Sequence, residues 1–588
     1  MDECEQVEQK IDLIVPADEP QPAQSDESPP SQAGVLTEPL QSNVTTPAVS
    51  ELQLHMSAAQ MKPLPARFIC GASSSQAFNR PMVVFGQMLT FFLIVATLAY
   101  LWAHHMLGAG STWLYLAIPI GLAAVLLVPA FYAVKLQAKA MTELLGGALH
   151  PLAFFDRDVF IPISYGVVGD ALQGTNHYLL AATCYGKVVR TVHPIDVLSK
   201  HRVFEREMII SLAYAGKFKQ ALIYADNSVR YAEYLFSTVE SVATRNYFAF
   251  TTRTAAMAYE LAGDKAKANE LRLRCYESAK DLPLSSEARL FANLARAEAY
   301  FQAEDFDSAL PLLQEFVQNF SAYRLALGTH LNSRAYHFLA ICHAHQRNFD
   351  EARRMHRLGL DKGNLDVSTF VAAEGVCAES QILKLSGSVD EADSLIDSAL
   401  KKLQAPPGSV LWRKLTSLRS KPSSNNAIMH PDDDVSDYDD EPVAAPILAD
   451  EKKMVYSLFR TNLGIVIAAI AIAFFSHWSF NLAWILLPAI AYSIYRLRNL
   501  KMRSQAGAAA IASGMPIMVK AKFTGFCDLF ISEDDATRKT YKAVCPELCS
   551  KLNEIVGENV VKAVAYTDDS GQISAIQMLG HYFSVSPK

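Results

Sequence analysis

The fold is decided by residues 336–352, YHFLAICHAHQRNFDEA, which contain two apolar segments separated by a polar break. Tyr336 and Leu339 are spaced as neighbours on one face of a helix, and the break follows at residues 346–348. Phe349 opens the second segment, and Ala352 comes three residues after it. Helical spacing on both sides of a break predicts two antiparallel helices joined by a tight turn.

The same pattern occurs five times between about residues 209 and 400. Each copy places an alanine early in its second segment, and a small residue lets two helix backbones approach closely. These anchor alanines are Ala221, Ala268, Ala309, Ala352 and Ala392. Three breaks contain a glycine, namely Gly216, Gly263 and Gly387. Glycine tolerates the left-handed conformation that often ends a helix, so we expect that conformation there.

This pattern resembles the tetratricopeptide repeat (TPR). The anchors are 47, 41, 43 and 40 residues apart, whereas the family repeat is about 34 residues, so longer helices or turns are implied. Because one hairpin leaves an apolar face uncovered, we expect stacking. The resemblance implies a mainly α fold with a TPR-like α-solenoid over 146–420, and an irregular first hairpin at 164–200 closes its start. An ordinary helical bundle with alanine-rich contacts is the alternative.

The resemblance also implies where a partner binds. Such repeats usually hold an extended peptide or a partner helix on the concave face, which the first helices line. The charged or polar candidates on those helices are Arg253, Glu298, Arg334 and His337. An ordinary solvated helix face is the other interpretation. The Lys and Asn clamp of the chaperone-binding subgroup is not in register, so that subgroup's ligand is not implied.

Two acidic stretches flank this region. Residues 1–78 are rich in Pro, Gln, Ser, Glu and Asp, which predicts a disordered tail. Residues 421–451 carry nine acidic side chains and one Lys, so self-repulsion predicts an extended linker. Docking of this linker on the basic remainder, or phosphorylation of Ser436, are alternatives. The chain has net charge -7. Outside the acidic stretches the chain is positively charged, which suits binding to an anionic membrane surface. The chain has no run of basic residues interleaved with aromatic residues, so the sequence does not indicate nucleic-acid binding.

Two regions contain long apolar runs. Residues 82–103 and 113–134 are long enough to cross a bilayer as a hairpin, and residues 462–477 and 480–495, within 461–496, predict a second. One long helix or a shallow re-entrant hairpin is the alternative for the second region. Lys and Arg flank both hairpins on the outside. They predict a multi-pass integral membrane protein, in contact with the lipid bilayer, with the repeats and both termini in the cytoplasm.

The last segment, residues 516–588, predicts a small α+β domain. Strands are expected at 519–526, 560–566 and 573–583, and a helix at 536–556. The nine cysteines follow no framework, which favours free thiols in a reducing compartment. Cys545 and Cys549 lack two further ligands nearby, so we expect buried thiols there rather than a metal site.

No catalytic motif is evident. The chain contains no HExxH, no GxxxxGK[ST] and no GxSxG, and no GxGxxG after a predicted strand. We therefore expect no catalytic, cofactor-binding or metal-binding residues, no cofactor and no enzyme activity. The sequence predicts a membrane-anchored adaptor or scaffold whose cytoplasmic repeats bind a protein partner. The alternatives are an enzyme or ligand-binding protein with its activity in the C-terminal domain and the repeats as a regulatory arm, and a transport or membrane-shaping component. Neither the partner nor the oligomeric state follows from the sequence.

Overall fold

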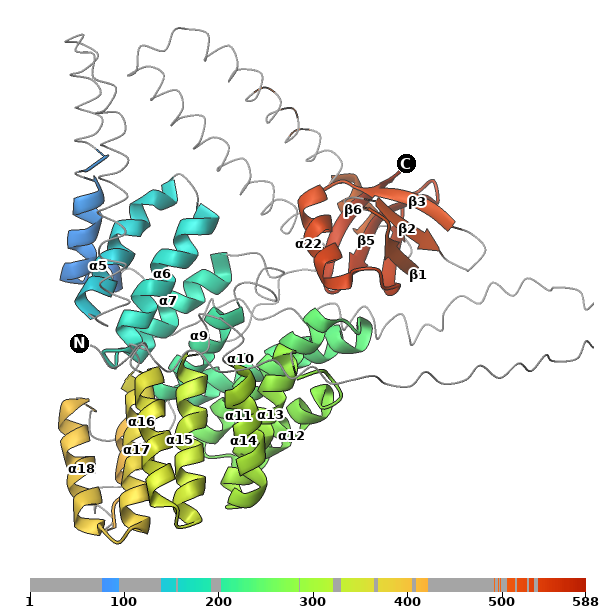
Figure 1. The fold of residues 1–588 in the computed structure, drawn as a ribbon. Helices are drawn as coiled ribbons and strands as arrows, with labels where there is room; N and C mark the ends of the chain where they lie inside the picture. The colour runs from blue at the N-terminus through green and yellow to red at the C-terminus, as the bar shows by residue number, and fades with distance from the viewer. Residues whose placement is uncertain are drawn as a thin grey trace, which may run out of the picture. The chain divides into compact units, whose positions relative to one another are not determined.

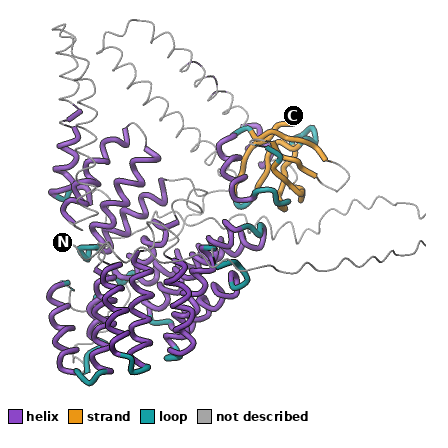
Figure 2. Tube along the Cα trace, viewed as in Figure 1, coloured by secondary structure: helices purple, strands orange, loops and turns teal. Residues whose placement is uncertain are grey.

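The computed structural model describes residues 77–94, 139–191, 202–320, 329–363, 369–420 and 505–588, with short gaps inside these ranges, and single residues at 491, 495 and 498. The protein is mainly helical, with a small C-terminal sheet domain (Figure 1). In the described part of the chain, all strands belong to that C-terminal domain (Figure 2). The predicted tail, apart from residues 77 and 78, and the whole predicted linker lie outside the described residues.

The helical part begins with α5 (Lys139–Leu149) and the short 3-10 helix η1 (His150–Phe154). Six helical hairpins follow in the described residues, and each packs against the next in chain order. They are α6 (Arg157–Gln173) with α7 (Tyr178–Thr191), α9 (Arg202–Tyr214) with α10 (Phe218–Thr238), α11 (Val242–Ala262) with α12 (Lys265–Ala279), α13 (Glu287–Gln302) with α14 (Phe306–Phe320), α15 (Thr329–His345) with α16 (Phe349–Gly363), and α17 (Thr369–Leu385) with α18 (Val389–Lys402). The short helix α19 (Val410–Thr416) packs on α17 and α18.

All six hairpin turns have the same backbone geometry. Each has one residue with a left-handed φ, between 60° and 94°, two positions before its second helix. These residues are Asn176, Gly216, Gly263, Glu304, Arg347 and Gly387. At the third turn, the N–H groups of Gly263 and Asp264 donate to the carbonyls of Glu260 and Tyr259, both at 3.0 Å, and the equivalent pair occurs in the other five. These bonds satisfy carbonyls that a helix end leaves unpaired. The expected left-handed conformation of the three glycines is confirmed.

The anchor alanines lie beside these turns. All five are fully buried, and each is the fourth residue of its second helix. The first hairpin has the same arrangement, because Ala181 is also fully buried and follows Tyr178 by three residues. The hairpin expected to be irregular at 164–200 therefore shares the turn and the anchor of the others. Its turn has Asn176 where three other copies have glycine, and Asn is a residue that tolerates the left-handed region.

The predicted membrane topology is corrected by the structure. Among the described residues, no helix is both long enough and apolar enough to cross a bilayer. The predicted multi-pass localisation is therefore wrong, and the lipid contact that depended on it is not retained. The first predicted hairpin lies outside the described residues after residue 94, and the second lies outside them except for residues 491 and 495.

The described start of the first apolar run packs against protein. Residues 81–91 form a helix beside α5, and the Thr90 hydroxyl donates to the Ala148 carbonyl at 2.8 Å. The backbones come so close that a Cβ added at Gly147 would lie 2.1 Å from the Val83 carbonyl oxygen. The apolar side chains of such a run can pack against another helix as well as against lipid. Composition therefore does not separate the two environments.

The C-terminal domain is a closed barrel of six antiparallel strands. They are β1 (Pro516–Phe523), β2 (Asp528–Ser532), β3 (Arg538–Ala543), β4 (Val561–Thr567), β5 (Ile573–Met578) and β6 (His581–Pro587). Their order is β1-β2-β3-β6-β5-β4, and pairing of β1 with β4 closes the barrel. Helix α22 (Pro546–Val556) connects β3 to β4. Closure pairs the edge strands, which would otherwise present unpaired backbone groups.

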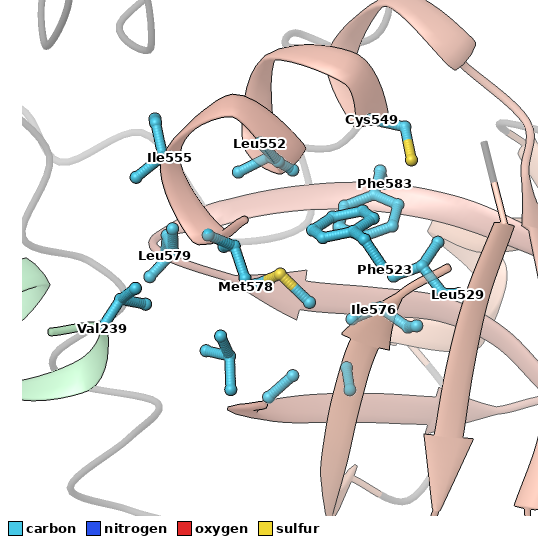
Figure 3. Close-up of a cluster of buried hydrophobic side chains, with 14 of the residues drawn as sticks. Val239, Phe523, Leu529, Cys549, Leu552, Ile555, Ile576, Met578, Leu579 and Phe583 are labelled. Atoms are coloured by element: carbon cyan, nitrogen blue, oxygen red, sulfur yellow. The ribbon is translucent and has the colours of Figure 1, made fainter. Parts of the chain in front are cut away.

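Apolar side chains fill the barrel core. Phe523, Ile576 and Phe583 lie in this core, and Cys549 and Leu552 of α22 cover them (Figure 3). The free thiols of Cys545 and Cys549 are both fully buried among these side chains. Burial of these apolar side chains stabilises the barrel through the hydrophobic effect. Three polar side chains on its strands, Gln577, His581 and Ser584, are also buried.

Three details of this domain differ from the sequence prediction. Strand β2 was not expected. The strand expected at 573–583 is two strands, β5 and β6, separated by a turn in which Leu579 and Gly580 are left-handed. The helix expected from residue 536 begins only at Pro546, after strand β3. In β3, buried Tyr541 and Ala543 flank exposed Lys542, which is the period of a strand. That pattern is too short to separate from a helix by apolar spacing alone.

We predict that Gly147→Ala weakens the packing of residues 81–91 on α5. A glycine to alanine change inside a helix normally stabilises it by up to about 1 kcal/mol. Here the added methyl would meet the Val83 carbonyl, so we expect the free energy of unfolding to fall by about 1–3 kcal/mol. Hydrogen exchange of residues 81–91, with chemical denaturation of the full chain, measures both effects.

Gly525→Ala is the matched control, because the atom nearest to its added Cβ is 3.7 Å away. It should change neither readout. If Gly147→Ala is as stable as the wild type and leaves exchange at residues 81–91 unaltered, the close contact does not exist in solution.

Candidate functional site

The four predicted partner-contact residues are nearly fully buried. Arg253 lies on α11, Glu298 on α13, and Arg334 and His337 on α15, with exposed fractions of 3%, 1%, 7% and 3%. The structure brings the first three together in one ion-pair network and leaves His337 in a separate polar cluster. None of the four lies on an ordinary solvated face. Their contact with a partner stays a prediction.

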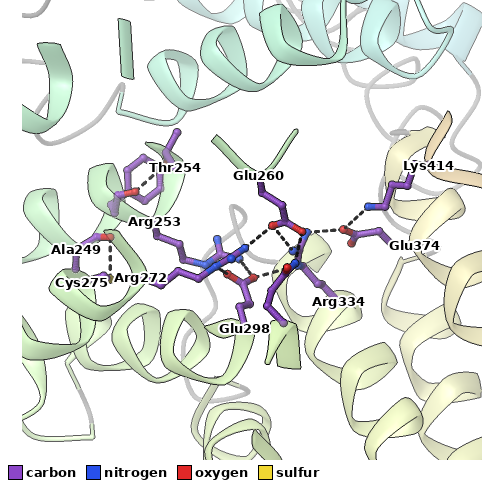
Figure 4. A network of polar contacts seen from close by, with 12 residues as sticks. Ala249, Arg253, Thr254, Glu260, Arg272, Cys275, Glu298, Arg334, Glu374 and Lys414 are labelled. Atoms are coloured by element: carbon purple, nitrogen blue, oxygen red, sulfur yellow. Dashed lines mark hydrogen bonds and ion pairs between the residues drawn. The ribbon is translucent and has the colours of Figure 1, made fainter. Parts of the chain in front are cut away.

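The network forms a ladder of alternating charges across five helices. Its members are Arg253, Glu298, Arg334, Glu374 on α17 and Lys414 on α19, and we call it the charge ladder (Figure 4). Successive nitrogen–oxygen distances along it are 2.6, 3.0, 2.5 and 3.5 Å. Each step joins the first helix of one hairpin to that of the next, or α17 to α19. Each charged side chain of the ladder therefore contacts a side chain of opposite charge on the next hairpin or on α19.

Two side branches supply further partners to the ladder. Arg272 of α12 pairs with Glu260 of α11, and its Nε lies 3.6 Å from Glu298 Oε2. Gln302 donates to Glu260 Oε1 at 2.7 Å. The Arg272 side chain is only 1% exposed. A buried charge is costly unless it is paired and hydrogen-bonded, so Arg272 adds a third positive charge beside Glu298 to those of Arg253 and Arg334.

The electrostatics keep Glu298 and Arg334 of the ladder ionised. Burial opposes ionisation of Glu298, but Arg253, Arg334 and Arg272 outweigh it and lower its pKa to about 2. Burial likewise opposes the charge of Arg334, and the carboxylates of Glu374 and Glu298 raise its pKa above the ordinary range. Groups shifted this way do not exchange protons near neutral pH. The ladder is suited to ion pairing and positioning rather than to general acid–base work.

Sequence reasoning missed four members of this network: Glu260, Arg272, Glu374 and Lys414. The signal that could have found Glu374 and Lys414 is the alternation of charge at intervals of about 40 residues, which matches the repeat period. Glu260 and Arg272 had no such signal. They are recognised only when the two helices of one hairpin are seen together.

His337 belongs to a second buried cluster between α15, α16 and α17. Its Nε2 lies 3.3 Å from the Ser333 hydroxyl, and that hydroxyl donates to the Gly359 carbonyl at 2.7 Å. The ring of His356 is tilted against it with centroids 5.1 Å apart. Because the Ser333 proton is committed to Gly359, the serine oxygen accepts from His337 Nε2–H. This assigns the Nε2-protonated tautomer to His337.

Glycines make room for the His337 ring. A Cβ added at Gly359 would lie 2.6 Å from His337 Cε1, and one at Gly375 would lie 3.3 Å from Nε2. Burial, and then the neighbouring His356, lower the pKa of His337 to about 3. His356 in turn lies beside a carboxylate, because its Nε2 is 3.7 Å from Glu379 Oε2. A neutral His337 therefore fills a tight space between three helices.

Across the described ranges, no group of three or more His, Cys, Asp or Glu side chains is arranged to hold a metal ion. In the cluster of His337 and His356, the carboxylate of Glu379 lies beside His356. The geometry thus defines a class of site, a buried ion-pair network inside a stack of helical hairpins.

Comparison with known proteins adds no relative. No family model matches this chain, and no curated protein matches it significantly.

We predict that Glu298→Gln destabilises the helical part strongly. The amide keeps the size of the carboxylate but leaves Arg253, Arg272 and Arg334 without their shared counter-charge. Breaking a buried pair by removing one partner costs about 3–5 kcal/mol, which chemical denaturation followed by helical circular dichroism would measure. The control is Glu351→Gln, which removes a carboxylate paired with Arg354 at the surface. It should have a far smaller effect, and equal effects would mean that the ladder is hydrated.

We predict that His337 makes the folded state less stable as pH falls. The unfolded chain binds a proton on this ring below about pH 6.5, whereas the folded chain does so only near pH 3. Stability contributed by the neutral ring is complete above pH 6.5 and is lost as the pH falls below that value. Between pH 7 and pH 5 the loss from this ring is about 2 kcal/mol.

Unfolding free energies of His337→Asn should therefore depend less steeply on pH over this interval. His177→Asn removes an exposed histidine and should keep the wild-type slope. An unchanged slope in His337→Asn would show that His337 titrates normally in the folded protein.

Proposed function

We propose that the six hairpins form a TPR-like solenoid and that the protein is a scaffold that binds a protein partner through it. The observation that carries this proposal is the recurrence, in six consecutive hairpins, of a left-handed turn residue and a fully buried alanine five positions later. Repeats of one unit that contact their neighbours build an extended surface, and such surfaces are used for binding other proteins.

The long period fits this proposal. The left-handed residues are spaced like the anchors, at intervals longer than a repeat of about 34 residues. Helices α10 and α11, with 21 residues each, account for the extra length at one place. Elsewhere the connections between hairpins account for it, because α12 ends at Ala279 and α13 begins at Glu287. The repeat thus keeps the turn and the small contact residue, while helix or connection length varies.

The polar groups also support binding over catalysis. The ladder carboxylates and guanidiniums are held in ion pairs, and the pKa of Glu298 and that of Arg334 are shifted away from neutrality. Apolar side chains occupy the centre of the C-terminal barrel. Neither arrangement supports the alternative in which that barrel is an enzyme or ligand-binding domain and the hairpins are its regulatory arm.

The test is crosslinking mass spectrometry on the full chain in a native extract. We expect lysines exposed on the hairpins, such as Lys265, Lys280 and Lys401, to crosslink to one second protein reproducibly, because a scaffold holds its partner against the solenoid surface. Lys542 and Lys562, exposed on the barrel, report contacts of the C-terminal domain separately. Intermolecular crosslinks from the barrel alone, with only internal crosslinks from the hairpins, would contradict the proposal.

A further inference from the structure

The first and last hairpins of the helical part contact one another. A cluster of buried side chains joins helices far apart in sequence: Tyr178 of α7, Ile210 and Tyr214 of α9, Met257 of α11, Phe370 of α17 and Val410 of α19. Hairpins in a linear stack contact only their neighbours, so a contact between its ends is an additional closure.

This closure is a continuous chain of contacts. The Asn176 amide donates to the Leu403 carbonyl at 2.6 Å and accepts from the Tyr178 hydroxyl at 3.0 Å. The ring of Tyr178 stacks on Tyr214 at 5.3 Å between centroids, and Tyr214 packs on Phe370 at 4.3 Å. We call these five residues the seam. Asn176 is also the left-handed residue of the first hairpin turn, so that turn positions the amide that reaches Leu403.

We propose that the seam opens as a unit while the hairpins stay folded, and that opening uncovers Glu374 and Arg334 toward the Lys414 end of the charge ladder. The seam lies at that end, because the Lys414 ammonium is 5.5 Å from the centroid of the Phe370 ring. Glu374 and Arg334 are the ladder groups that it screens, with side chains 10% and 8% exposed.

The seam can open without breaking the charge ladder, because the two sets of contacts join different pairs of helices. Every step of the charge ladder joins neighbouring hairpins or joins α17 to α19, so none has to break when the seam parts. The ladder contact that spans further, Glu260 of α11 with Arg334 of α15, is the long one at 3.9 Å. Regions with few contacts open at lower free energy than the whole fold.

The buried hydroxyl of Tyr214 favours the open state of the seam. Its hydroxyl is buried and has no hydrogen-bond partner among the described residues, although its ring is held on both sides. Burial, and next the charge of Glu374, raise its pKa well above the ordinary value. A buried hydroxyl without a partner is unfavourable, so opening restores its hydrogen bonding to water. The closed seam is therefore stabilised by ring contacts and the Asn176 amide against this cost.

Opening gives the proposed scaffold a way to admit a partner to polar groups that are otherwise covered, and this consequence rests on the proposed function. The opening itself does not, because it is a property of the free chain. The two ideas are tested apart: crosslinks from the hairpins test the scaffold, and hydrogen exchange without any partner tests the seam.

The experiment is hydrogen exchange with mass spectrometry on the full chain, comparing wild type with Asn176→Gly combined with Phe370→Ala. Glycine keeps the left-handed turn but removes the amide, and alanine removes the ring between Tyr214 and Lys414. We expect exchange in α7, α9 and α17 to rise about tenfold, with exchange in α12, α13 and α14 unchanged. Asn176→Gly alone gives a smaller rise in the same helices, and serves if the double variant folds poorly.

Glu304→Gly is the matched control, because Glu304 is the left-handed residue of the α13–α14 turn and is far from the seam in sequence. It should leave exchange in α7, α9 and α17 at the wild-type rate. Two results overturn the proposal: no change in those helices in the double variant, which means that the seam does not hold them, or an equal rise in every hairpin, which means that the seam does not open separately.

Discussion

The helical part depends on one backbone constraint, the left-handed residue two positions before the second helix of each hairpin. It reverses the chain within a few residues and lets two N–H groups satisfy the carbonyls of the helix that ends there. The reversal leaves the two helices so close that only a small side chain fits, and the buried alanine five positions later meets that demand. Without the sharp turn there would be no reason for alanine at that position, and successive hairpins would not present the same faces to one another.

The second determinant is polar rather than apolar. The first helices of the last four hairpins bury alternating charges, and each of these hairpins therefore contacts an opposite charge on its neighbour. A network of this kind adds less net stability than its distances suggest, because its groups must first leave water. Its effect is on specificity, since a hairpin displaced by one position along the ladder would bury two like charges. The same network explains why side chains that suggest a solvated groove in the sequence are covered in the folded chain.

The charged candidates show how far sequence reasoning reached toward the site. Arg253, Glu298 and Arg334 were selected because they occupy corresponding first helices, and the structure does bring them together. Their burial did not follow from the sequence, because exposure depends on how closely the folded hairpins pack against one another. His337 shared their helix face but belongs to another cluster, since its neighbours Gly359 and Gly375 come from the next two helices. A glycine that makes space for a ring has no signature in a single sequence.

The sequence by itself determined the mainly helical character, the positions of five hairpins and the small residues at their contacts, because helical spacing and turn chemistry are local. It also indicated a sheet-containing C-terminal domain. Only the tertiary structure decided that the strands close into a barrel, that the start of the first apolar run packs on α5, and that the first and last hairpins meet. The physical reason is common to all three: apolar residues record only that a surface avoids water, and the partner that covers the surface is chosen by segments distant in the chain.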